Sequence, residues 1–134
     1  MKERVMKRKK RYKFIVEKTA TGFSAFSNDL PVFTTGKTMT ELQNNLLEAL
    51  ELALEPDSQN LSSNNIELEI DLKQFFQYYR VINSKYLAER IGMNPTLFSH
   101  YVNGHKKPSS KQTTRILNGL NEVGRELANL QFVN

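Results

Sequence analysis

The chain has 134 residues, of which 39% are hydrophobic and 25% charged, with a formal net charge of +5, so it can form one ordinary domain or two small ones. The absence of cysteine excludes disulfides, Cys-ligated zinc, iron–sulfur clusters and thiol nucleophiles, and a metal site built on the two histidines would need carboxylates. No stretch is long and apolar enough to span a bilayer, and no apolar segment follows the basic N-terminus as in a secretory signal, so we expect a cytoplasmic protein without a membrane partner.

The net charge is distributed in three blocks. Residues 1–13 have a net charge of +7, residues 14–82 of −6 and residues 83–134 of +4. An acidic middle followed by a basic last third suggests two modules with different partners. A basic block favours nucleic acid, because Lys and Arg that neutralise phosphates release condensed counterions. The alternative is that the blocks only keep the protein soluble.

The first predicted elements are three short strands. Residues 12–17 are β-branched and aromatic, and a turn at 19–22 separates them from a second strand at 23–27, so we expect a hairpin. A turn at 28–31 then leads to a third strand at 32–35.

A helix and a fourth strand complete the N-terminal half. Thr38 and Glu41 have the spacing of a capping box, in which each side chain satisfies a backbone N–H of the first turn. The apolar stripe of this helix ends before Pro56 and consists of Leu42, Leu46, Ala49, Leu50 and Ala53. Polar residues 57–65 predict a loop, and strict alternation over 66–72 predicts a half-buried strand with Ile66, Leu68, Ile70 and Leu72 on one face. The order strand, strand, strand, helix, strand predicts a small layer of the α+β class, with the helix on one face.

From Gln74 onward the pattern is helical. A first face is formed by Phe75, Phe76 and Tyr79, with Ile82 as a further candidate. Ser84 is the candidate N-cap of a helix that carries Leu87, Ala88 and Ile91 and ends at Gly92. Another helix begins around Pro95 and ends at Asn103-Gly104. The last helix begins at 108–110 and turns inward Ile116, Leu117, Leu120, Val123 and Leu127. We therefore predict a basic lead at 1–11, one domain at 12–72 and a helical domain at 73–134.

Residues 85–109 carry the most functional information. A short helix, a tight turn at Gly92 and a second helix expose the short polar side chains Asn94, Thr96, Ser99, His100 and Asn103. Such side chains suit base edges and phosphates, whereas Glu and Lys dominate an ordinary solvated face. Lys106 and Lys107 follow, where the chain would pass a DNA backbone. The alternative is a helical hairpin without a DNA partner. Taken alone, His100 is as compatible with a surface residue that contacts no DNA as with a residue that contacts a base.

This segment resembles the phage-repressor (XRE-type) helix-turn-helix family. The resemblance rests on Leu87-Ala88-Glu89-Arg90-Ile91-Gly92, Leu97-Phe98-Ser99 and Asn103-Gly104-His105-Lys106-Lys107-Pro108-Ser109. It implies a five-helix domain whose second motif helix lies in the major groove of double-stranded operator DNA. In that family the positions of Thr96 and His100 commonly reach bases, and those of Ser99 and Asn103 touch phosphate or cap the helix. Pro95 departs from the polar residue that relatives often carry there.

The N-terminal half resembles the HicB antitoxin family. The matching segments are 12–17, Gly22-Phe23-Ser24-Ala25-Phe26, Asn28-Asp29-Leu30-Pro31, Thr35-Gly36-Lys37-Thr38 and Glu48-Ala49-Leu50-Glu51-Leu52. The departures are Val32-Phe33 after the turn and Asn44-Asn45 in the helix. The resemblance implies a truncated ribonuclease-H-like layer that binds a HicA-type mRNA-cleaving toxin, while the second domain represses the operon. The candidate toxin-binding regions are 23–29 and 39–54, and the acidic 14–82 block complements a basic partner.

We expect no catalysis, and no cofactor or metal. Two-metal hydrolysis needs several converging carboxylates, yet the first strand offers only Glu17, and Asp29 lies in a turn. Two alternatives stay open: a stand-alone transcriptional regulator whose N-terminal domain binds another protein or ligand, and a protein that binds or cuts RNA. The basic lead is either an arm that reaches nucleic acid or a solvated tail.

Repressors of this motif class read two half-sites, so we expect a homodimer or a higher homo-oligomer. The apolar C-terminal residues Leu127, Leu130, Phe132 and Val133 are candidates for the contact, and equally for the last turn of the core.

Overall fold

The computed structural model describes residues 10–55 and 60–132, which divide into two compact units between Asp71 and Leu72. Most of the basic lead, part of the predicted loop and Val133 lie outside the described residues. A four-stranded mixed sheet and five α-helices make up the described chain, which is compatible with the α+β class predicted from the sequence.

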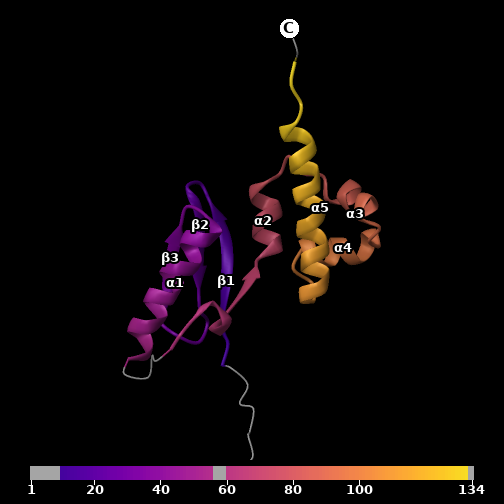
Figure 1. Cartoon of the computed structure of the whole chain (residues 1–134). Helices are drawn as coiled ribbons and strands as arrows, with labels where there is room; N and C mark the ends of the chain where they lie inside the picture. Colours follow the sequence, from indigo (N-terminus) through magenta and orange to yellow (C-terminus); the bar gives the residue numbers. More distant parts are fainter. Residues whose placement is uncertain (1–9, 56–59, 133–134) are drawn as a thin grey trace, which may run out of the picture. The chain divides into compact units, whose positions relative to one another are not determined.

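The first unit is one sheet covered by one helix. Its strands are β1 (Tyr12–Thr19), β2 (Gly22–Phe26), β3 (Phe33–Gly36) and β4 (Ile66–Ile70), in the spatial order β3-β2-β1-β4. The two hairpin pairs are antiparallel, whereas β4 runs parallel to β1. A parallel pair needs a crossover, which α1 (Met39–Leu54) provides on one face of the sheet (Figure 1). A short 3-10 helix, η1 (Ser63–Asn65), precedes β4 within the predicted loop.

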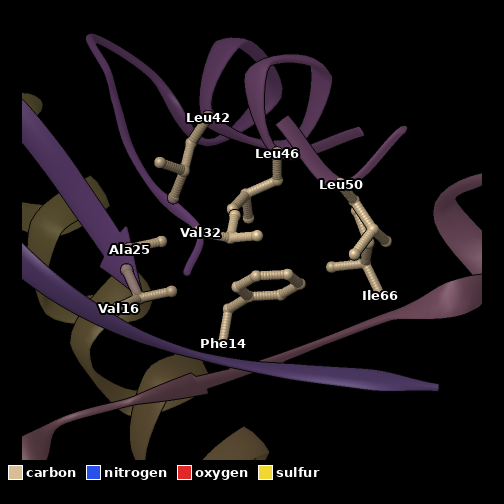
Figure 2. Packing of buried hydrophobic residues seen from close by; sticks show 8 residues of the cluster. All are labelled: Phe14, Val16, Ala25, Val32, Leu42, Leu46, Leu50 and Ile66. Carbon is tan, nitrogen blue, oxygen red and sulfur yellow. The ribbon is translucent and has the colours of Figure 1, made fainter. Parts of the chain in front are cut away.

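The core of this unit lies between the sheet and α1. Figure 2 shows the Phe14 ring of β1 pointing toward Leu46 on the helix. Val16 and Ala25 lie opposite each other in the antiparallel register and therefore share the covered face. The buried cluster comprises Phe14, Val16, Ala25, Val32, Leu42, Leu46, Leu50 and Ile66. Ala53, predicted on the helical stripe, is instead exposed, because Leu54 packs against the core at the end of the helix.

The start of α1 is held by side-chain caps. The Thr38 hydroxyl accepts a hydrogen bond from the Glu41 amide at 3.1 Å, as the predicted capping box requires. The Glu41 carboxylate accepts from the Lys37 amide, one residue earlier than that motif places it. A Cβ at Gly36 would lie 2.4 Å from the Leu42 amide nitrogen, so only glycine lets β3 pass this close to the first turn of α1.

The second unit is helical. The described residues from Leu72 on form four helices, one fewer than the repressor resemblance implies: α2 (Leu72–Tyr78), α3 (Ser84–Ile91), α4 (Pro95–Val102) and α5 (Ser110–Ala128). Its buried residues include Leu72, Phe76, Leu87, Ala88, Met93, Phe98, Tyr101 and Ile116, and the rings of Phe76 and Phe98 meet edge to face at 5.8 Å.

Several predicted boundaries differ from the observed ones by one or two residues, and contacts in the structure explain two of them. The strand predicted over 66–72 ends at Ile70: the Asp71 amide donates to the Val16 carbonyl at 3.0 Å, and Leu72 is the buried first residue of α2. The apolar/polar alternation of the strand extends to Leu72 only because Leu72 is also apolar, and this residue is buried in the core of the second unit. The N-cap of α3 is Asn83 and not Ser84, since the Asn83 side chain accepts from the Tyr86 amide at 3.2 Å.

Candidate nucleic-acid interface

Helices α3 and α4 are joined by a tight turn at Gly92. This residue has a φ of 71° and ends α3, and the next amide, Met93, donates to Ala88 at 2.9 Å. The left-handed conformation favours glycine, which explains why the sequence breaks the helix here. The side-chain oxygen of Asn94 then accepts from the amides of Thr96 and Leu97 at 2.9 and 3.1 Å and begins α4. Asn94 therefore caps α4 through its side-chain oxygen. Its side-chain NH₂ group is the donor that it can offer to a bound molecule.

All seven residues predicted to contact DNA are exposed. Four of them, Thr96, Ser99, His100 and Asn103, have the spacing i, i+3, i+4 and i+7 that places side chains on one face of a helix. The opposite side of α4 buries Phe98 and Tyr101 in the unit's own core. The structure thus brings these four polar side chains together on an outer face.

Ser99 and Asn103 hydrogen-bond to each other. The Asn103 side-chain nitrogen donates to the Ser99 hydroxyl at 3.1 Å, and the Asn103 amide donates to the Ser99 carbonyl at 2.9 Å. Asn103 is also the C-cap residue of α4. The pair therefore helps to end α4. The second N–H of the Asn103 side chain and the Ser99 hydroxyl are the groups that it can offer to a bound molecule.

The loop after α4 folds back onto its last turn. Gly104 has a φ of 78°, and the His100 carbonyl accepts from the amides of His105 and Lys106 at 2.9 and 3.1 Å. The rings of His100 and His105 lie 6.2 Å apart, nearly perpendicular. This return places the start of the lysine pair, Lys106 and Lys107, beside the exposed face of α4.

A depression of about 360 Å³ connects that face with the N-terminus of α3. Its lining consists of Ser84, Lys85, Pro95, Thr96, Phe98, Ser99 and His100. The sequence did not single out Ser84 and Lys85 as site residues. The signal was present, because a helix N-terminus with a neighbouring lysine attracts phosphate, but only the packing of α3 against α4 shows that it borders the polar face.

The stretch of sequence that contains this face has no acidic side chain. No acidic residue occurs from 91 to 121, whereas this stretch contains Lys106, Lys107, Lys111 and Arg115. The acids that follow, Glu122 and Glu126, accept from the Arg90 guanidinium, and these hydrogen bonds raise the pKa of Arg90 above its ordinary value. The Arg90 side chain thus links α3 to α5 through ion pairs.

Two features of α5 fix its position against α3. The Arg115 guanidinium donates to the carbonyls of Ile91 and Gly92 at 3.0 and 3.3 Å, so it caps the C-terminus of α3. At Gly119 an added Cβ would lie 2.4 Å from the Ile91 Cγ2 atom, so α5 approaches α3 closely at this point.

The regions predicted to bind a toxin lie in the first unit. The Ser27 hydroxyl accepts from the amides of Asp29 and Leu30 at 3.0 Å, which fixes the turn and leaves Asn28 and Asp29 exposed. Along α1 the exposed side includes Glu41, Glu48 and Glu51, and the helix contains no Lys or Arg. Asn45, one of the departures from the HicB pattern, donates to the Thr35 carbonyl at 2.7 Å and so ties α1 to β3.

Within the described ranges, no three or more of the potential ligands His, Asp and Glu gather into a possible metal site. None of the described helices is both long and apolar enough to cross a membrane. No protein-family model matches the chain, and neither does any curated protein or any solved structure with which it was compared.

Proposed function

We propose that the second unit binds double-stranded operator DNA, with α4 in the major groove. The observation that carries this proposal is the outer face of α4, where four short polar side chains recur at helical spacing in a stretch without acids that also contains Lys106 and Lys107. Lys85 of α3 lines the depression beside this face. Short hydroxyl, amide and imidazole groups match the donors and acceptors of base edges, and the lysines match phosphates. An ordinary helical hairpin has no reason to exclude acids from its exposed face.

We further propose that the first unit, a HicB-like truncated ribonuclease-H-like layer, binds and neutralises a small basic HicA-type toxin that cleaves mRNA. In this reading the chain is a cytoplasmic antitoxin that represses its own operon and is not itself an enzyme. The exposed carboxylates of α1 support the proposal, because a ribonuclease that binds RNA presents a basic surface.

The DNA proposal is tested by comparing binding to the chain's own promoter with binding to unrelated DNA. Thr96→Ala should relax the preference at one or two base pairs, at a cost of about 1–3 kcal/mol for a good contact. Thr40→Ala, which removes an exposed threonine from α1, is the matched control and should leave the preference unchanged. An unchanged preference in Thr96→Ala would contradict base reading by this residue.

The toxin proposal is tested by purifying the native chain from its source cells. A stoichiometric small basic partner should co-purify, and its ribonuclease activity should appear only after this chain is removed. Replacing Glu48 and Glu51 by Lys should weaken that association, whereas Glu89→Lys, an exposed control on α3, should not. A chain that purifies alone but shifts its promoter DNA would favour a stand-alone regulator instead.

A further inference from the structure

The two histidines of the chain, His100 and His105, lie beside each other at the end of α4. Their ring centres are 6.2 Å apart, and the ring planes are nearly perpendicular, at 86°. Both side chains are exposed, and within the described ranges neither imidazole makes a hydrogen bond or an ion pair. Their ring nitrogens are therefore accessible to a ligand from solution.

The backbone between the histidines is closed into a loop. The His100 carbonyl accepts a hydrogen bond from the His105 amide at 2.9 Å, and Gly104, with a φ of 78°, makes the left-handed turn between them. The side chain of Lys73 on α2 packs against this turn, because its Cδ atom lies 3.3 Å from the position of a Cβ at Gly104. Bringing two flexible ligands together costs chain entropy, and here the folded backbone holds both residues close before any ligand binds.

The separation of the two rings suits two ligands of one metal ion. A coordinating nitrogen lies about 1.1 Å from its ring centre and about 2.1 Å from the ion, so two imidazoles on one ion have centres at most about 6.4 Å apart. The observed 6.2 Å lies within this limit. A tetrahedral angle at the ion needs centres about 5.2 Å apart, so the rings have to approach each other by about 1 Å, which rotation of exposed side chains provides.

We propose that His100 and His105 together bind one transition-metal ion of the class of Zn²⁺, Ni²⁺ or Cu²⁺. Imidazole nitrogen suits these ions, whereas Mg²⁺ and Ca²⁺ prefer oxygen ligands. Among the described residues no Asp or Glu joins the pair, and Lys106 follows it directly, so the site offers no negative charge to a hard cation. Water completes the coordination in place of the carboxylates expected from the sequence, so binding is weaker than at a closed site of four protein ligands.

This site goes beyond the proposed DNA binding, although it shares His100 with it. A ring nitrogen that coordinates a metal ion cannot also contact a base edge. Zn²⁺ at a concentration that saturates the wild-type chain should therefore reduce its preference for the promoter over unrelated DNA. The preference of His105→Gln should not change, and an equal reduction in this variant would mean that zinc acts elsewhere.

A zinc titration of the full chain without an affinity tag, followed by NMR, tests the site without DNA. Because the chain has only two histidines, the ring protons of each can be followed separately. The titration is made at about pH 7.5, where an ordinary imidazole is neutral and can coordinate a metal. The signals of both rings should shift along the same binding curve with one ion per chain, and Mg²⁺ at the same concentration should shift neither.

His100→Gln and His105→Gln should each weaken zinc binding at least tenfold, because only one imidazole remains. Gln77→Ala, which removes an exposed polar side chain from α2, is the matched control and should bind zinc as the wild type does. The far-UV circular dichroism of each variant establishes that it is folded. Ring signals that do not respond to zinc or that follow different binding curves, single-histidine variants that bind as tightly as the wild type, or a zinc-induced increase in the sedimenting mass, which would place the ion between two chains, would overturn the proposal.

Discussion

Removing Lys106 and Lys107 should change how strongly DNA binding depends on salt. Lys85 lines the depression beside the polar face of α4, and the loop that carries the two lysines folds back onto the end of this helix, so we assign one phosphate contact to each of the three lysines. With about three phosphates neutralised per chain, the logarithm of the binding constant of one chain on a single half-site should fall with the logarithm of salt concentration at a slope of about −2.7. Between 50 and 200 mM salt, this slope corresponds to about a 40-fold loss of affinity.

The double variant Lys106→Ala/Lys107→Ala retains one of those contacts. Its slope should be about −0.9, and the same increase in salt should reduce its affinity only about 3.5-fold. The effect should be equal on promoter and unrelated DNA, because phosphates carry no sequence information. Fluorescence anisotropy of a labelled duplex, titrated at four or five salt concentrations, measures these slopes.

A matched control separates a local contact from the loss of net charge. Lys37→Ala removes one positive charge from the first unit, where Lys37 is exposed, and it should leave the slope unchanged. Lys106→Ala alone should reduce the slope by about 0.9. If the double variant keeps the wild-type slope, or if Lys37→Ala changes the slope as much as Lys106→Ala does, the lysine pair does not contact DNA as the geometry indicates.

Three further predictions concern stability and are measured by urea unfolding. Phe14→Ala should cost about 3–5 kcal/mol, because the ring is fully buried beneath α1, and a loss below about 1 kcal/mol would contradict that burial. Gly119→Ala should lower the urea midpoint, because the clash of the new methyl group with Ile91 costs about 1–3 kcal/mol and the gain in helix propensity of about 1 kcal/mol offsets only part of it. Adding Ile91→Ala should remove the clash, and a double variant that is still destabilised by the Gly119→Ala change would show that the strain arises elsewhere. Asn94→Ala should lower the free energy of unfolding by about 0.5–2 kcal/mol, because it removes the N-cap of α4. Asn118→Ala, an exposed control on α5, should change it by no more than about 0.5 kcal/mol, and equal effects of the two variants would mean that the cap does not stabilise the protein.

The sequence predicted those elements whose periodicity and end signals agree. The stripe of Leu42, Leu46 and Leu50 follows the helical period and begins directly after the Thr38 cap, and α1 forms there. The helix break at Gly92 was predictable for the same reason, because glycine favours the left-handed conformation that ends α3. Local chemistry is sufficient where neighbouring residues decide the outcome.

The features that the sequence did not predict depend on contacts between distant residues. Leu72 continues the alternation of β4, and only its burial among the helices of the second unit shows that it begins α2. The exposed face of α4 could be read from spacing alone, since Thr96, Ser99, His100 and Asn103 recur at helical intervals. That Lys85 borders this face could not, because the angle between α3 and α4 is set by packing and not by any local pattern.

The parallel pairing of β1 with β4 has a consequence for the order in which the chain is made. Tyr12 pairs with Ile66, so β1, one of the two inner strands of the sheet, keeps one edge open until almost the whole first unit has been synthesised. During that interval β1 can pair only with β2, and Ile66, the core residue that β4 supplies, is missing. A nascent or truncated chain that ends before Ile66 exposes an apolar strand edge, the kind of edge that can join to another chain, and the pairing of β4 with β1 closes it.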